Sequence, residues 1–196
     1  MTKGEETKLR IVKTALDCFY EVGLTETTFK MISERSGLTQ PGIYAYFRDK
    51  NSLLLSCSAY AIERGREFVG AELSKESDAK NVLKTYLKMN LKWAFEDRKV
   101  IHSLIAMYYF GATHPPLQKL HWDIDQNSIT RIEGFLLAGN REHCWKIRDP
   151  KKTAREIHSA MVGEMIKIFH WPKERSLAER YRDFWSFISK AVTASS

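Results

Sequence analysis

Apolar residues recur at helical spacing along almost the whole chain. In the segment from about residue 7 to 22, Ile11, Ala15, Phe19 and Val22 follow at intervals of four and three, which predicts a helix with one apolar face. Comparable patterns predict helices at about 51–68, 78–96, 100–110, 116–138, 150–169 and 174–192. No segment alternates as a strand does, and there is no repeat or low-complexity tract, so we expect an all-α protein of about nine helices.

Two short helices complete that number, and their spacing predicts a helix-turn-helix. Gly37 can form the tight turn between them, and the small Ser33 lets the two helices approach closely. Leu38 and Ile43 then serve as apolar anchors for the crossing angle. We therefore expect a helix-turn-helix within the first 50 residues.

The stretch GLTQPGIYAYFRDK, residues 37–50, places Pro41 and Gly42 directly after this turn. Such a pair usually ends a helix. In the first turn of a helix, however, proline is tolerated because that N–H has no intrahelical partner. Thr39 is the predicted cap of this second helix, and Thr27 or Thr28 that of the first.

Composition and charge narrow the class of protein only slightly. The chain has 196 residues, of which 43% are hydrophobic and 28% are charged, as in an ordinary globular protein. The net charge is +7, but residues 1–66 hold 10 basic against 8 acidic side chains, a net of only +2. If the first domain binds nucleic acid, the placement of a few groups must account for it rather than its bulk charge.

We expect a cytoplasmic protein with no membrane span, cofactor or metal. The charged start of the chain lacks the apolar core of a signal peptide, and no run of about 18 apolar residues is present. Cys18, Cys57 and Cys144 lie far apart in apolar surroundings, which indicates buried, reduced thiols.

The pattern of residues 8 to 60 resembles the TetR family of bacterial transcriptional regulators. The positions that carry the resemblance are Ile11, Ala15, Phe19, Gly23, Thr28, Ile32, Gly37, Leu38, the run IYAYF, Lys50 and the leucines of NSLLL. The resemblance implies a homodimeric repressor that binds double-stranded operator DNA through residues 1–50. It also implies that residues 51–196 form a helical domain that binds an inducer and dimerises.

Three positions depart from what is common in that family. Ser33 stands where relatives usually have Ala, which exchanges one small residue for another. Pro41-Gly42 and Ala45 replace residues that are often Lys, Arg or Gly, then Thr and His. The base preference of relatives therefore does not carry over to this chain.

Within the motif, the second helix is expected to enter the major groove with its first turn nearest the bases. Gln40 is the candidate reader of an adenine edge, and Tyr44 of a phosphate oxygen, although Tyr44 and Tyr46 could instead lie half-buried between helices. A basic arm of Lys3, Lys8 and Arg10 is interpreted as solvated tail. The predicted DNA-binding residues are Thr27, Thr28, Lys30, Thr39, Gln40, Pro41, Gly42, Tyr44, Ala45, Tyr46 and Lys50.

The remaining two thirds of the chain suggest an effector site and a dimer interface, with ordinary core packing as the alternative. Aromatic and Met-rich residues suit a small, largely apolar or aromatic effector, and Asn90 lies beside an apolar stripe that includes Val82. The predicted ligand-binding residues are Tyr86, Met89, Asn90, Trp93, Met107, Tyr108, His121 and Trp122. The predicted dimer residues, on the last two helices, are Met161, Met165, Ile168, Tyr181, Phe184, Trp185 and Ile188.

Two other functions remain as alternatives to an effector-controlled repressor. A helical enzyme would need a nucleophile with its base or a metal set, and Glu164 is the lone candidate acid on an apolar helix. A helical interaction adaptor, or a regulator without a small-molecule ligand, would use the same fold. We expect that the protein is not an enzyme.

Overall fold

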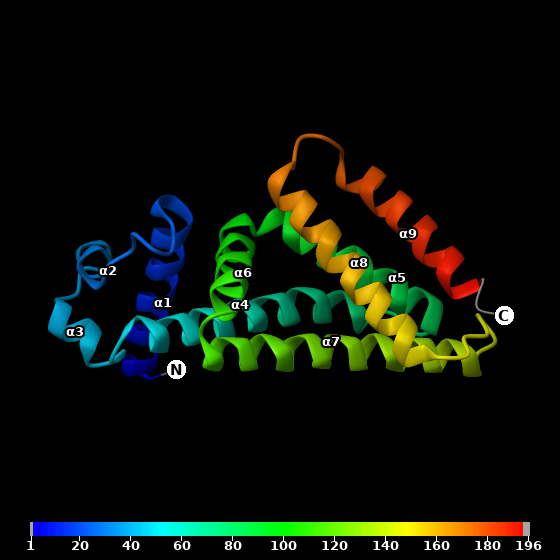
Figure 1. The fold of residues 1–196 in the computed structure, drawn as a ribbon, viewed down its shortest axis with the longest axis horizontal. Coiled ribbons are helices and arrows are strands. Elements are labelled where there is room, and N and C mark those ends of the chain that lie inside the picture. Colours follow the sequence, from blue (N-terminus) through cyan, green and yellow to red (C-terminus); the bar gives the residue numbers. More distant parts are fainter. Residues whose placement is uncertain (1, 194–196) are drawn as a thin grey trace. The chain divides into compact units, whose positions relative to one another are not determined.

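The computed structural model describes residues 2–193 and contains nine α-helices and no strand within that range, which confirms the all-α prediction (Figure 1). The helices are α1 (Lys3–Val22), α2 (Phe29–Ser36), α3 (Gln40–Tyr44), α4 (Lys50–Leu73), α5 (Ala79–Glu96), α6 (Arg98–Gly111), α7 (Pro115–Arg141), α8 (Pro150–His170) and α9 (Leu177–Thr193). Over the described range, no helix has both the length and the apolar content that crossing a membrane requires.

The described residues form two compact units, and each unit combines distant parts of the chain. One unit contains residues 2–64 and 99–121, and the other contains residues 65–98 and 122–193. Helices α4 and α7 therefore contribute residues to both units. The domain boundary predicted between residues 50 and 51 stays a prediction.

The first unit is built on the apolar face of α1. Ile11, Ala15 and Phe19 are fully buried, as are Ile32 of α2 and Ile43 of α3. The chain leaves α1 through Gly23, whose φ of 87° lies in the region that favours glycine. The predicted apolar spacing of the motif is thus confirmed by burial.

Helix α1 begins earlier than its apolar pattern suggests. The Thr2 side chain accepts from the Glu5 N–H at 3.3 Å, and the Glu5 carboxylate accepts from the Thr2 N–H at 2.7 Å. This reciprocal cap fixes the first turn. Lys3, Lys8 and Arg10 therefore lie on a helix, and their interpretation as a tail was wrong.

The second unit is organised around α5, against which α8 and α9 pack (Figure 1). Leu83, Leu87 and Leu91 of α5 are fully buried. Gly65 lies against the Trp93 indole so closely that a Cβ there would stand 2.6 Å from the ring. Glycine at this position therefore lets α4 and α5 approach.

The loop between α7 and α8 is held by two side chains. The Trp145 indole lies over Gly139 and donates its N–H to the Leu136 carbonyl at 2.8 Å. The Asn140 side chain both donates to the Ile147 carbonyl and accepts from its N–H, each at 2.9 Å. The loop is therefore fastened to the end of α7 at two points.

Candidate nucleic-acid interface

The N-terminus of α2 is prepared by two adjacent threonines with different tasks. Thr28 is the N-cap, and its hydroxyl accepts from the Met31 N–H at 3.2 Å. Thr27 is only 2% exposed and donates its hydroxyl to the Gly23 carbonyl at 2.8 Å. The prediction that Thr27 contacts DNA was therefore wrong, because its hydroxyl is buried and already bonded.

The turn after α2 has the geometry that the sequence predicts. Gly37 adopts the left-handed conformation, with φ 67° and ψ 26°, and donates its N–H to the Ser33 carbonyl. Ser33 itself is buried, so a larger residue has no room where the two helices approach. This confirms the helix-turn-helix arrangement of α2 and α3.

Helix α3 begins at the Pro-Gly pair instead of ending there. The Thr39 hydroxyl accepts from the Gly42 N–H at 3.2 Å, and Pro41 stands in the first turn. Ile43 and Phe47 are buried. The rest of the segment is turned outward: Gln40, Pro41, Tyr44, Ala45 and Tyr46 are exposed, and Gly42 is half-buried.

The two tyrosines of this segment differ in their surroundings. The Tyr44 ring packs on Phe29 of α2 with 5.0 Å between ring centroids, yet 55% of the residue remains exposed. Tyr46 is less exposed, and its hydroxyl lies near Gly4 in the first turn of α1. Tyr44 therefore offers an oriented phenol to a neighbouring molecule, whereas Tyr46 lies against its own protein.

Lys50, at the start of α4, makes a contact that its sequence does not reveal. Its ammonium donates to the Thr25 carbonyl in the loop before α2, at 3.0 Å. Burial lowers the pKa of Lys50, against a smaller opposite effect of Glu26. Lys50 thus ties α4 to the loop that carries the α2 cap. By contrast, Lys30 is exposed, and its ammonium lies 4.0 Å from the Glu34 carboxylate.

The residues predicted to bind an effector are divided between the two units. Tyr86, Met89, Asn90, Trp93 and Trp122 belong to the second, and Met107, Tyr108 and His121 to the first. In the second, Tyr86, Met89 and Trp93 are buried, and Trp122 is exposed. The Asn90 amide donates to the Tyr86 carbonyl of its own helix at 2.8 Å. Its polar group is therefore satisfied without a ligand.

In the first unit the same class of residues is packed in a different way. Met107 is fully buried, and its sulfur accepts from the Ser58 hydroxyl at 3.1 Å. The buried His121 ring meets the half-exposed Tyr108 edge-on, with 4.8 Å between ring centroids. Met107 is thus part of the core, and Tyr108 is the accessible member.

The predicted dimer residues lie on the wrong face of α8 and α9 to meet a second copy. Met161, Ile168, Phe184 and Ile188 are buried within a single chain. Tyr181 and Trp185 receive the ammonium groups of Lys88 and Lys84 from α5, and Met165 is half-buried. The four buried residues are a correction, because the apolar stripe that suggested an interface is the core of the protomer.

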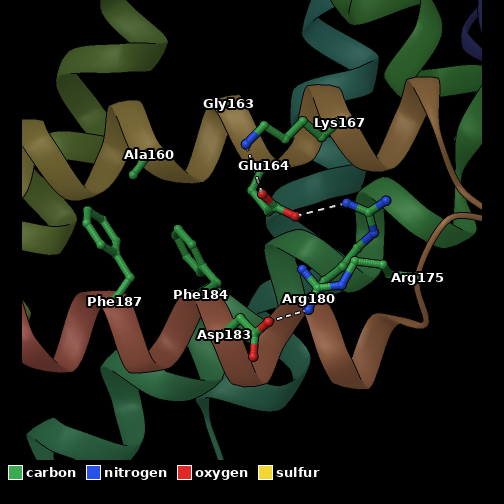
Figure 2. Close-up of a pocket in the computed structure, with 9 residues that line it drawn as sticks. All are labelled: Ala160, Gly163, Glu164, Lys167, Arg175, Arg180, Asp183, Phe184 and Phe187. Atoms are coloured by element: carbon green, nitrogen blue, oxygen red, sulfur yellow. Dashed lines mark hydrogen bonds and ion pairs between the residues drawn. The ribbon is translucent and has the colours of Figure 1, made fainter.

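A pocket of about 390 Å³ lies between α8 and α9 on their outer side (Figure 2). Glu164 reaches from α8 to Arg180 of α9, with 3.0 Å between carboxylate and guanidinium, and Lys167 lies 3.8 Å from the same carboxylate. Glu164, the lone acid of the enzyme alternative, is therefore engaged in ion pairs. Within residues 2–193, no group of three or more His, Cys, Asp or Glu side chains is placed to hold a metal ion.

Residues 11–57 match the family model for "Bacterial regulatory proteins, tetR family". The HTH-type transcriptional regulator YerO of Bacillus subtilis is 30% identical over 97 residues, which cover 47% of this chain and 31% of that protein. The class A tetracycline repressor protein from transposon 1721 of Escherichia coli is 41% identical over 51 residues, 24% of each chain. The chain therefore matches less than a third of the length of either relative.

The fold extends over much more of the chain than these sequence matches. A transcriptional regulator from Saccharomonospora viridis, solved in complex with choline, superimposes with a TM-score of 0.85 and covers 94% of this chain and 96% of that one. The two sequences are 18% identical. At that identity the similarity shows a common fold for both parts of the chain.

Proposed function

Because its N-terminal segment places this chain in the tetR family of bacterial regulatory proteins, we propose that it is a DNA-binding transcriptional regulator: a cytoplasmic, homodimeric repressor that a small-molecule effector releases from its operator. The observation that carries this proposal is the construction of α3. Its inward residues Ile43 and Phe47 are buried, while Gln40 and Tyr44 project from a capped and exposed first turn.

The residues of the motif take separate roles on a duplex. Gln40 hydrogen-bonds to a base edge in the major groove, where an amide matches adenine. Pro41, Gly42 and Ala45 allow the backbone to approach closely and leave part of the selection to DNA shape. Thr28, Lys30, Thr39 and Tyr44 contact phosphates around the α2 N-terminus and the groove wall. Tyr46 supports α1, and Lys50 acts through Thr25.

Two copies are needed to read a palindromic operator, with recognition helices roughly 34–36 Å apart. The interface that we propose is the outer face of α8 and α9, because the apolar stripe on their inner face is occupied by α5. Ile166 and Phe187 are the large apolar residues of these two helices that stay exposed on that outer side.

Effector release follows from linkage: a ligand that binds better to the conformation with mismatched reading heads weakens operator binding by the same factor. The choline complex of the Saccharomonospora viridis regulator supports a small-molecule site in this fold. For this chain, Tyr108 and Trp122 are the accessible aromatic candidates among the predicted ligand residues.

A regulator without an effector is the second candidate. It is favoured by the internal bond of Asn90 and by the burial of Met89 and Trp93, which leave these residues with no need of a ligand. Native mass spectrometry of the purified protein distinguishes the two. A co-purified molecule that lowers operator affinity supports the effector, and unchanged operator affinity across a metabolite panel supports its absence.

The proposed function is tested by a mobility-shift titration on a palindrome from the protein's own promoter, repeated at several salt concentrations. We expect saturable binding to the palindrome at protein concentrations that leave a random duplex free, with affinity that falls steeply as salt rises. Equal affinity for both duplexes would remove sequence-specific regulation and leave the adaptor as the better explanation.

A further inference from the structure

The outer surface of α8 and α9 carries both a hollow and a projection. The hollow is the pocket of about 390 Å³, whose apolar lining consists of Ala160, Gly163, Phe184 and Phe187. Figure 2 shows Phe184 and Phe187 extending from α9 toward Ala160 and Gly163 of α8. The projection is Phe187 itself, of which 59% remains exposed although it lines the edge of the pocket.

Phe187 is an isolated apolar residue on this side of α9. The exposed positions around it are polar: Arg182, Asp183, Ser186 and Lys190. A single large aromatic residue on an otherwise polar helix face is the usual form of an interface anchor. Its burial inside the protomer is prevented because Phe184 and Ile188 already occupy the inner face.

The charged end of the pocket is neutralised from within, so it does not call for a charged ligand. Arg180, only 3% exposed, donates to the Glu164 carboxylate at 3.0 Å, to the Trp171 carbonyl at 2.7 Å and to the Glu174 carboxylate at 3.2 Å. Arg175 is paired with Asp183. The unfilled requirement of the pocket is therefore apolar contact at its Ala160–Gly163 side.

The size of the hollow fits an aromatic ring. A cavity of roughly 150 Å³ lined by apolar groups already holds a benzene molecule. The glycine at position 163 removes the side chain that would otherwise fill the floor, and a Cβ built there meets no atom within 4 Å. The pocket can therefore admit a phenyl ring without displacing any group of its own protomer.

We propose that this pocket receives Phe187 of the partner subunit, and that the reciprocal insertion fixes the register of the homodimer. The inference rests on the homodimer of the proposed function. A two-fold axis places each subunit's pocket opposite the same surface of the other, so that a hollow and a knob on one face satisfy each other twice. The occupant is thus a second copy of this chain.

Two substitutions test the insertion by sedimentation equilibrium over a dilution series. Gly163→Leu fills the pocket, and we expect it to raise the dimer dissociation constant by roughly a hundredfold or more, because the symmetric interface meets the clash twice. Phe187→Ala removes the knob, with an expected increase of the same order, since buried aromatic anchors dominate interface energy.

Matched controls separate this effect from misfolding. Gly134→Leu is a second open helical glycine, on α7, and Tyr109→Ala removes an exposed aromatic residue from α6. Both controls should dimerise as the wild type does. Circular dichroism should show native helix content in Gly163→Leu, because leucine is a better helix former than glycine.

Each result bears on the inference. Monomeric, helical Gly163→Leu and weakened Phe187→Ala support it. If both variants dimerise with the wild-type constant, the insertion is refuted while the homodimer of the proposed function stands. A wild-type protein that is monomeric at all concentrations, free and on DNA, overturns both.

Discussion

Tyr44 combines a fixed ring with a free hydroxyl, which allows its two parts to be separated by mutation. Tyr44→Phe keeps the packing on Phe29 and loses only the phenolic group. We expect operator affinity to fall roughly tenfold, because each protomer loses one hydrogen bond to phosphate worth about 1 kcal/mol. The loss should be equal on operator and random duplexes, because a phosphate contact carries no sequence information.

Fluorescence anisotropy with both duplexes measures this effect, and Tyr109→Phe, an exposed tyrosine on α6, is the control. Gln40→Ala provides the opposite pattern: it should narrow the difference between operator and random duplex. Full affinity in Tyr44→Phe together with unchanged discrimination in Gln40→Ala contradicts the assignment of α3 as the reading helix.

Lys50 distinguishes a positioning residue from a direct phosphate contact. Since its ammonium is bonded to the Thr25 carbonyl, Lys50→Met should lower operator affinity by loosening the α2 cap, without changing the number of neutralised phosphates. The slope of log K against log salt should therefore stay at the wild-type value. Lys50→Arg, which keeps a donor, should restore part of the affinity.

Lys30→Met is the matched control on the same motif. Lys30 is exposed, and its loss should reduce the salt slope by about 0.9 for each phosphate released. A reduced slope in Lys50→Met would show that Lys50 reaches the backbone of the DNA, as its sequence position alone suggested.

At the scale of helices, the capping and turn residues made the first unit predictable. Gly37, Thr39 and Pro41 each act through local backbone geometry, so their roles can be inferred without knowing what lies nearby. The choice between Thr27 and Thr28 was not accessible in this way, because it depends on the Gly23 carbonyl that accepts from Thr27. Lys50 likewise bonds a carbonyl 25 residues away.

The last two helices could be located from sequence, but their faces were assigned incorrectly. An apolar stripe such as Met161 and Ile168 looks the same whether it packs on α5 or on a second copy, because both environments remove the same side chains from water. Phe187 carries no stripe and was missed. A lone aromatic residue outside the apolar face is the one signal that could have indicated it.

The loop after α7 offers a test of close packing at the level of one element. A Cβ on Gly139 would stand 2.1 Å from the Trp145 indole, so Gly139→Ala must displace that ring and its bond to Leu136. We expect a loss of about 1–3 kcal/mol in the free energy of unfolding by urea, as for other overpacked sites. Trp fluorescence should report a more exposed indole.

Gly134→Ala on the same helix is the control, because its Cβ meets no atom within 4 Å. It should be neutral or more stable by up to about 1 kcal/mol, in line with helix propensity. Equal stability of the two variants would show that Trp145 moves aside without cost.

The contact between α7 and α8 makes the second unit sensitive to acid. His158 is buried, with its Nε2 3.8 Å from the Asp125 carboxylate. Burial lowers the pKa of His158, and Asp125 opposes this only in part. The unfolded chain therefore binds more protons than the folded one as pH falls through about 6.5, and stability is lost in acid.

We expect the urea midpoint of the wild type to decrease between about pH 7.5 and 5.5, and His158→Gln to lose part of that decrease. His170→Gln, at an exposed position, should retain the wild-type profile. Parallel profiles for the wild type and His158→Gln would mean that His158 does not titrate differently on folding.

For the whole molecule, the proposed dimer turns two short helices into a ruler for DNA. A single α3 spans only Gln40–Tyr44, so one protomer can contact few base edges, and specificity depends on engaging two half-sites at once. Inserting about five base pairs between the half-sites rotates one of them by half a helical turn to the opposite face of the duplex.

We expect such an operator to bind with roughly the affinity of a single half-site, because a dimer held by reciprocal insertion of Phe187 cannot twist to follow the rotated site. The same insertion placed outside the palindrome should leave binding unchanged, and mobility-shift titrations compare the three duplexes. Equal affinity for all of them would mean that the protomers read DNA independently. In that case the register fixed by α8 and α9 would have no role in operator choice, and an effector acting on that register could not release the protein.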